Sequence, residues 1–181
     1  MIADRQARIA ASLDSVHEAL RFVHRELDHV ASDPQRWRWI SVGAVIALQG
    51  ALVAALSGYE TAEEGDVVDP SYPERYAPVT LLLRRARSTD YLNPPERLVL
   101  TGAAARRIEQ VIAFRNGVVH GTSPDIPGYS ESIHGPFRET FSAIRHVLLV
   151  HPAFDPGPHG LVTALIADQL AAISRRLVSD G

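Results

Sequence analysis

The chain has 181 residues and a formal net charge of −3, with 46% hydrophobic and 22% charged residues. This length fits one domain with a sizeable core, and the composition excludes an intrinsically disordered chain. The absence of cysteine excludes disulfides, thiolate nucleophiles and cysteine-ligated metals. Charged residues run through the first 30 positions, so the N-terminus lacks the apolar core of a secretory signal. We therefore expect a cytoplasmic protein.

The first expected helix spans residues 3–31. Its apolar residues recur from Ile9 in alternating steps of four and three, at Ile9, Leu13, Val16, Leu20, Val23, Leu27 and Val30. This 3.5-residue period predicts a narrow seam that packs against another helix. The period alone leaves open whether that helix belongs to the same chain or to a second copy.

A second helix is expected between a start signal at Asp33-Pro34 and a stop at Ser57-Gly58. Within it, residues 40–56 carry no charge, and this run of 17 residues includes two glycines and a glutamine. It falls short of the roughly 20 residues that a membrane span needs. We therefore predict a central helix covered by its neighbours and no membrane association.

The rest of the chain alternates loops and helices. Loops are expected at 58–77, 121–135 and 152–160, and helices at 78–87, from Pro136, and at 161–177. Asn93-Pro94-Pro95-Glu96 combines a capping residue, a proline start and a glutamate three residues after the cap, which predicts a fourth helix from about Pro94 to near Gly117. No alternating strand pattern appears, so the prediction is an all-α bundle of five to six helices.

The fourth helix carries the candidate chemistry. Its apolar residues Ile108, Val111, Ile112 and Val119 form one stripe, and Arg115 lies about 20° from Ile108, on that stripe. A guanidinium there needs a partner, and an ion pair with Glu109 or another acid is the structural explanation.

Two more polar residues follow Arg115. Asn116 and His120 are four residues apart and share a helical face, with Gly117 between them. Arg115 and His120 point about 140° apart in an ideal helix, because they are separated by five residues. Only a frayed helix end, the reach of the arginine or a second chain brings the two side chains together.

The stretch Phe114-Arg115-Asn116-Gly117-Val118-Val119-His120-Gly121 resembles the motif of the HEPN superfamily (higher eukaryotes and prokaryotes nucleotide-binding domain). That motif has an arginine, a polar residue that is commonly asparagine, a short spacer and a histidine near the end of a long helix in a small helical bundle. The resemblance rests on residues 93–121 and on the helical layout. It implies a single HEPN-like domain over residues 1–181.

The family resemblance also implies a homodimer that cleaves RNA in a shared cleft without a metal or cofactor. His120 would move a proton at the ribose 2′-hydroxyl or the leaving oxygen, and Arg115 would hold the scissile phosphate. Asn116 would orient the phosphate or His120. A toxin-like role, with an antitoxin or nucleotidyltransferase partner, is also implied. The alternative is a non-catalytic HEPN-like module that binds a nucleotide, RNA or a partner protein.

Arginine pairs near the motif add candidate phosphate contacts. Arg106 and Arg107 precede Arg115 by about two turns and are the expected substrate-binding residues, although adjacent arginines are commonly a solvated face. Arg84, Arg85 and Arg87 on the third expected helix have the same two interpretations.

Overall fold

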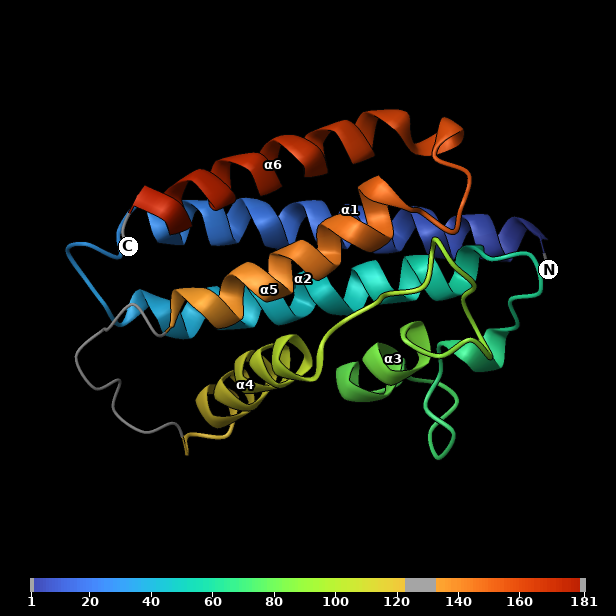
Figure 1. Cartoon of the computed structure of the whole chain (residues 1–181), viewed down its shortest axis with the longest axis horizontal. Coiled ribbons are helices and arrows are strands. Elements are labelled where there is room, and N and C mark those ends of the chain that lie inside the picture. The colour runs from blue at the N-terminus through green and yellow to red at the C-terminus, as the bar shows by residue number, and fades with distance from the viewer. Residues whose placement is uncertain (1, 123–132, 180–181) are drawn as a thin grey trace.

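The computed structural model describes residues 2–122 and 133–179, and helices joined by loops make up this part of the chain (Figure 1). The α-helices are α1 (Ile2–Leu27), α2 (Arg36–Gly58), α3 (Val79–Ala86), α4 (Gly102–Val119), α5 (His134–Arg145) and α6 (Gly160–Ser179). Short turns η1 (Glu64–Asp66), η2 (His146–Val150) and η3 (Gly157–His159) join them, and η2 continues α5 as a π-helical turn. Extended pairing in the described residues is limited to one antiparallel bridge between Val68 and Tyr76. The all-α prediction is confirmed.

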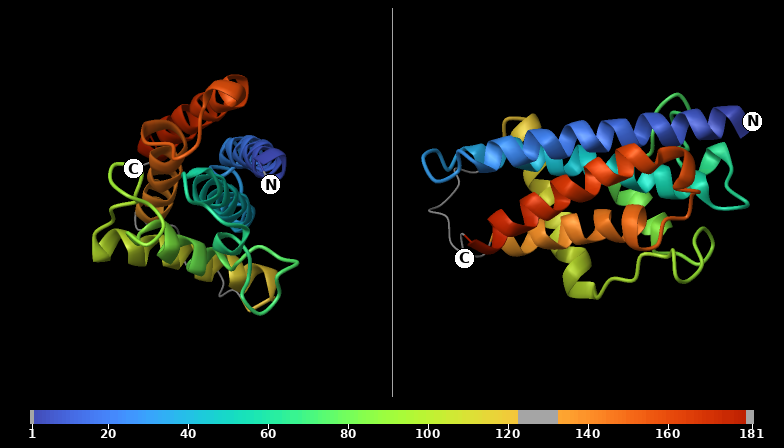
Figure 2. Two further views of the ribbon diagram at one scale, coloured as in Figure 1. Left: turned by 90° about the vertical axis from the view of Figure 1, so that its right-hand side faces the viewer. Right: turned by 90° about the horizontal axis from the view of Figure 1, so that it is seen from above.

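Helix α2 lies at the centre of the bundle. The end-on view shows α1, α5 and the α3–α4 layer arranged around it, with α6 beside α1 (Figure 2, left). Within the described chain, α2 is the one helix long and apolar enough to cross a membrane, yet 78% of its most apolar window is buried inside the protein. Its charge-free residues instead form the middle of the hydrophobic core, as predicted for a covered central helix.

The seam of α1 packs against α2 and α6 within the same chain. Its six seam residues from Ile9 to Leu27 are at most 5% exposed. Gly43 and Gly50 of α2 face this seam, and a Cβ atom on them would lie 2.7 Å from Val23 and 2.8 Å from Val16. The absence of side chains at these two glycines therefore allows the two long helices to approach closely.

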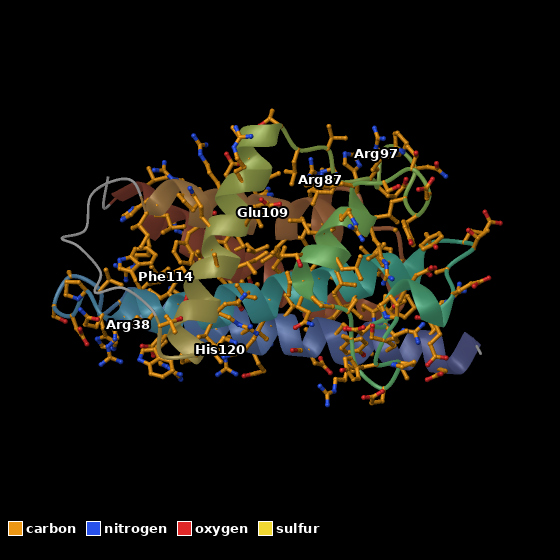
Figure 3. The ribbon with its side chains drawn as sticks, turned by 90° about the horizontal axis from the view of Figure 1, so that it is seen from below. Arg38, Arg87, Arg97, Glu109, Phe114 and His120 are labelled. Atoms are coloured by element: carbon orange, nitrogen blue, oxygen red, sulfur yellow. The ribbon has the colours of Figure 1, made fainter. Side chains whose placement is uncertain are left out.

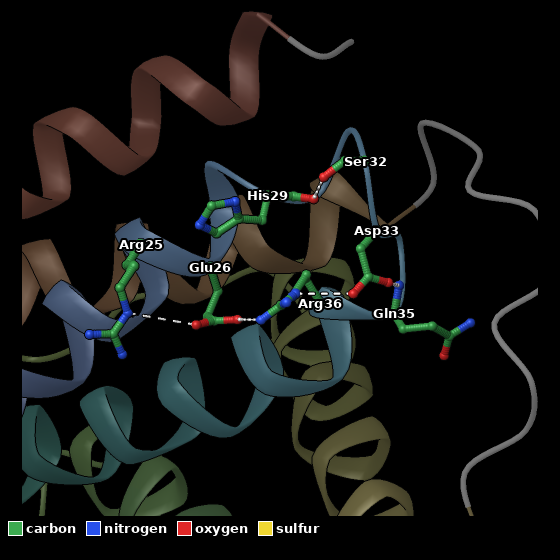
Figure 4. A network of polar contacts seen from close by, with 7 residues as sticks. All are labelled: Arg25, Glu26, His29, Ser32, Asp33, Gln35 and Arg36. Atoms are coloured by element: carbon green, nitrogen blue, oxygen red, sulfur yellow. Dashed lines mark hydrogen bonds and ion pairs between the residues drawn. The ribbon is translucent and has the colours of Figure 1, made fainter.

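An ion-pair network holds the turn between α1 and α2 (Figure 4). Glu26, only 7% exposed, accepts a hydrogen bond from Nη1 of Arg36 at 3.0 Å, and Asp33 accepts one from Nε of Arg36 at 3.1 Å. The hydrogen bond that Arg36 donates to the Glu26 carboxylate is the main cause that raises the pKa of Arg36. Because Asp33 also accepts from the backbone N–H of Gln35 at 3.1 Å, it caps the turn that leads into α2.

The predicted start of the fourth helix at Pro94 is wrong. Residues 93–101 form a turn and an extended connection, and the helix begins at Gly102, where the hydroxyl of Thr101 accepts from the N–H of Ala104 at 3.1 Å. A proline disfavours helical geometry in the residue before it, so Pro95 excludes Pro94 from a helix. The predicted loop at 121–135 lies largely outside the described residues.

The buried seam predicts a large loss of stability on truncation. Leu20→Ala removes a side chain that is 0% exposed, and we expect the free energy of unfolding to fall by about 2–5 kcal/mol in urea denaturation followed by circular dichroism. Leu161→Ala, at a position 79% exposed, is the control and should change stability by less than about 0.5 kcal/mol. If Leu20→Ala left the free energy of unfolding nearly unchanged and instead dissociated an oligomer, this result would contradict the packing of the seam within one chain.

Candidate functional site at the end of α4

Helix α4 is anchored along its first three turns and exposed at its end. The buried residues face α2 and α5 and are Ala104, Ala105, Ile108, Val111 and Ile112. After them the burial weakens: Arg115 is half-buried, and Val119, on the same predicted stripe, is 57% exposed. The core therefore holds the body of the helix, while the motif residues lie where α4 leaves the core.

The C-terminal end of α4 has a defined cap. Gly121 adopts φ +67°, the N–H of Thr122 donates to the carbonyl of Gly117 at 2.9 Å, and the N–H of Gly121 donates to that of Val118 at 3.4 Å. This pair of bonds is the Schellman arrangement, and it places His120 as the capping residue just before the left-handed glycine. The helix end predicted near Gly117 thus lies about one turn later, and His120 has a fixed backbone.

Arg115 contacts its neighbour rather than an acid. Its Nη1 donates to Oδ1 of Asn116 at 2.9 Å, and no ion pair with Glu109 is formed in the described chain. Its Nε is buried without a hydrogen-bond acceptor among the described residues. A buried N–H without an acceptor costs about 1–3 kcal/mol.

His120 and Asn116 are exposed. Figure 3 shows His120 at the tip of α4, with Phe114 about a turn and a half earlier and Glu109 further back along the helix. No hydrogen bond or ion pair in the described residues engages the His120 imidazole. Within one chain, a hydrogen bond therefore joins Arg115 to Asn116, whereas no hydrogen bond among the described residues joins the His120 side chain to either of them.

The predicted phosphate contacts on α4 lie apart from this end. Arg107 forms an ion pair with Glu139 of α5, Nη1 to Oε1 at 3.0 Å. Arg106 is exposed but nine residues before Arg115, which places it about 13 Å along the axis and about 180° around the helix. Neither arginine extends the surface formed by Arg115 and Asn116 in one chain.

The described residues contain no group of three or more histidine, aspartate or glutamate side chains placed to ligate a metal. His24 of α1, which shares a helical face with Asp28, contacts Gln169 of α6 through Nδ1 at 3.1 Å. Asp28 forms an ion pair with Arg176 of α6, Oδ1 to Nη2 at 2.5 Å. These polar residues join α1 to α6.

The third-helix arginines separate into two kinds. Arg85 is 8% exposed, and its Nη1 donates to the carbonyls of Asp66 and Val68 at 2.9 and 3.2 Å, so it anchors the loop before α3. Arg84 and Arg87 instead line a surface groove together with Arg97. Sequence reasoning missed Arg97, because the misplaced start of the fourth helix put it inside a helix.

The Schellman cap predicts that the end of α4 is most stable with glycine at position 121. Gly121→Ala forces a Cβ into the left-handed region, and we expect a loss of about 1 kcal/mol in the free energy of unfolding and fraying of the last turn of α4, measured by denaturation and amide hydrogen exchange. Gly65→Ala is the control, since Gly65 has an ordinary φ and open space around it. Equal stability of the two variants would argue against the cap.

No family model, curated protein or solved structure matches the chain. The resemblance of residues 114–121 to the HEPN motif is therefore carried by the residues themselves and by their place at the end of α4.

Proposed function

We propose that the chain is a HEPN-type, metal-independent endoribonuclease that acts as a homodimer through Arg115, Asn116 and His120. The observation that carries the proposal is the position of these residues on the exposed, capped end of α4, where no side chain among the described residues forms a hydrogen bond or ion pair with the His120 imidazole. A side chain that must exchange a proton with a substrate needs this accessibility together with a fixed backbone.

The chemistry suits RNA. A histidine removes the proton from a ribose 2′-hydroxyl, and the 2′-oxygen attacks the adjacent phosphorus. The bond to the 5′-oxygen breaks, and a protonated histidine supplies the proton for that leaving oxygen. The products are a 2′,3′-cyclic phosphate and a 5′-hydroxyl. Arg115, oriented by its hydrogen bond to Asn116, stabilises the charge on the phosphate oxygens.

A second copy is needed to complete this site. One chain offers a single motif histidine, and that residue points about 140° from Arg115 in helical projection. Val119 adjoins His120 and is an apolar side chain that is 57% exposed. Pairing two α4 ends about a two-fold axis covers Val119 and brings two His120 and two Arg115 side chains to one cleft.

The second candidate is a non-catalytic module that binds the phosphate group of a nucleotide or RNA. The half-buried Arg115, whose Nη1 is oriented by Asn116, favours it, because a positioned guanidinium binds an anion without any base nearby. The two functions differ in whether His120 is required for turnover.

The decisive experiment measures cleavage of a fluorescent RNA in the presence of a chelator. Wild type should yield 2′,3′-cyclic phosphate ends, and His120→Ala should lower kcat/KM by about 10²–10⁴-fold because proton transfer is lost. Arg115→Lys should lower kcat by about 10-fold or more, since lysine keeps the charge but not the bidentate fork.

Two controls make this test specific. His29→Ala removes an exposed histidine outside the motif and should leave activity unchanged. A substrate with a 2′-O-methyl group at the scissile position should resist cleavage. Retained activity in His120→Ala, or an inactive wild type that still binds RNA through Arg115, would reject the nuclease in favour of the binding module.

The dimer is tested separately by Val119→Asp. The charge should dissociate the dimer in sedimentation or sizing experiments and lower activity at least 10-fold, while the fold persists because Val119 lies outside the core. Leu161→Asp, at an exposed apolar residue of α6, should leave both properties unchanged. A wild-type protein that stays monomeric at high concentration would remove the shared cleft.

A further inference from the structure

Three arginines line an open groove at the C-terminal end of α3. The groove has a volume of about 390 Å³, and its walls include Arg84, Arg87, Ser88, Arg97 and Val99. Figure 3 labels Arg87 and Arg97 on the face that also carries α4. None of the residues that line the groove is acidic.

The fold brings these arginines together from two segments. Arg84 and Arg87 are three residues apart and so share one side of the end of α3, whereas Arg85 points inward to its carbonyl partners. Arg97 comes from the connection after α3.

Two hydrogen bonds fix that connection against its neighbours. The N–H of Leu98 donates to the carbonyl of Ala86 at 3.0 Å. The carbonyl of Arg97 lies 3.1 Å from Nε2 of His146, which can donate to it. The backbone around Arg97 is therefore held beside α3 before any ligand arrives.

The charge of the groove is uncompensated in the described chain. No ion pair or hydrogen bond there engages the guanidinium groups of Arg84, Arg87 or Arg97, and the Nε of Arg97 is buried without an acceptor. Asp90, two residues after Ser88 in the sequence, accepts a hydrogen bond from the Ser88 hydroxyl at 2.9 Å rather than from an arginine. Three like charges around one groove repel each other, and an anion between them removes that repulsion.

The stabilising effect of basic residues at a helix C-terminus does not account for this cluster. This effect of the helix C-terminus applies to Arg84, which lies in the last turn of α3, but not to Arg97, which lies outside the helix. The last carbonyls of α3 are also occupied, since those of Arg84 and Ala86 accept from the backbone N–H groups of Arg87 and Leu98.

The groove also has an apolar wall. Val99 is 71% exposed, and the half-buried Leu100 follows it. An inorganic ion would leave this surface in water, whereas the base or sugar of a nucleotide would cover it. We propose that Arg84, Arg87 and Arg97 bind the phosphate of an organic phosphate ester, with Val99 packed against its organic part. The site is separate from the end of α4 and does not depend on catalysis there.

The test compares wild type with Arg84→Gln and Arg97→Gln in binding to three probes: inorganic phosphate, adenosine monophosphate and a labelled single-stranded RNA. Each substitution should weaken the binding of the ester probe about tenfold or more, because each removes a charged hydrogen-bond donor. Arg97→Lys should retain part of the affinity. Arg138→Gln, at an exposed arginine of α5 outside the groove, should bind as wild type does.

The probes distinguish the source of the phosphate. Saturable binding of the mononucleotide identifies a nucleotide site. Binding of RNA alone, with a salt slope that falls by about 0.7 for each arginine removed, identifies a strand-binding site. The arginine variants must melt as wild type does for these results to count, and Arg84 is exposed enough to expect this. The proposal is overturned if the wild-type protein binds none of the probes or binds inorganic phosphate as tightly as the ester. It is also overturned if both Gln variants bind the ester with wild-type affinity.

Discussion

The burial of most of α2 is the constraint on which the rest of the fold depends. A helix without a charge from Ile40 to Leu56 is stable in water only when other helices cover most of its circumference. Helices α1, α3, α4 and α5 do so, and between Ile40 and Leu56 only Ile46 is exposed. Gly43 and Gly50 let α1 approach closely, so one long side of α2 is closed by a tight helix pair. The remaining sides are covered by shorter helices, which end where the central core ends.

This arrangement explains why both polar surfaces lie at helix ends. Helix α4 needs only its first three turns to cover α2, so the chain beyond Ile112 is free to carry Arg115, Asn116 and His120 at the margin of the core. Helix α3 is eight residues long and ends beside Arg84 and Arg87. Residues that cover the core are constrained to be apolar, whereas residues just past it are available for binding and catalysis.

The sequence predicted the parts of this fold that depend on local periodicity. The seam of α1 and the apolar length of α2 identify two long helices correctly, because burial imposes the period on the residues themselves. The start of α4 was predicted wrongly because Asn93-Pro94-Pro95-Glu96 has the side chains that are typical of a helix start. Pro95, however, disfavours a helical backbone conformation at Pro94. The hydroxyl of Thr101 forms the actual cap, where no helix start was predicted. Which of Arg84, Arg85 and Arg87 faces inward depends on the loop before α3, and no local pattern contains that information.

The geometry at the end of α4 also limits what one chain can do. The hydrogen bond from Arg115 to Asn116 orients a cation, and the Schellman cap fixes the backbone of His120, but a single imidazole must be both base and acid in one turnover. In the homodimer that we propose, a two-fold axis near Val119 would supply the second imidazole. The same pairing would cover Val119, an apolar side chain that the monomer leaves exposed. Under this proposal catalysis and association depend on the same few residues, and a change that abolishes pairing would leave at most the proposed binding function of Arg115.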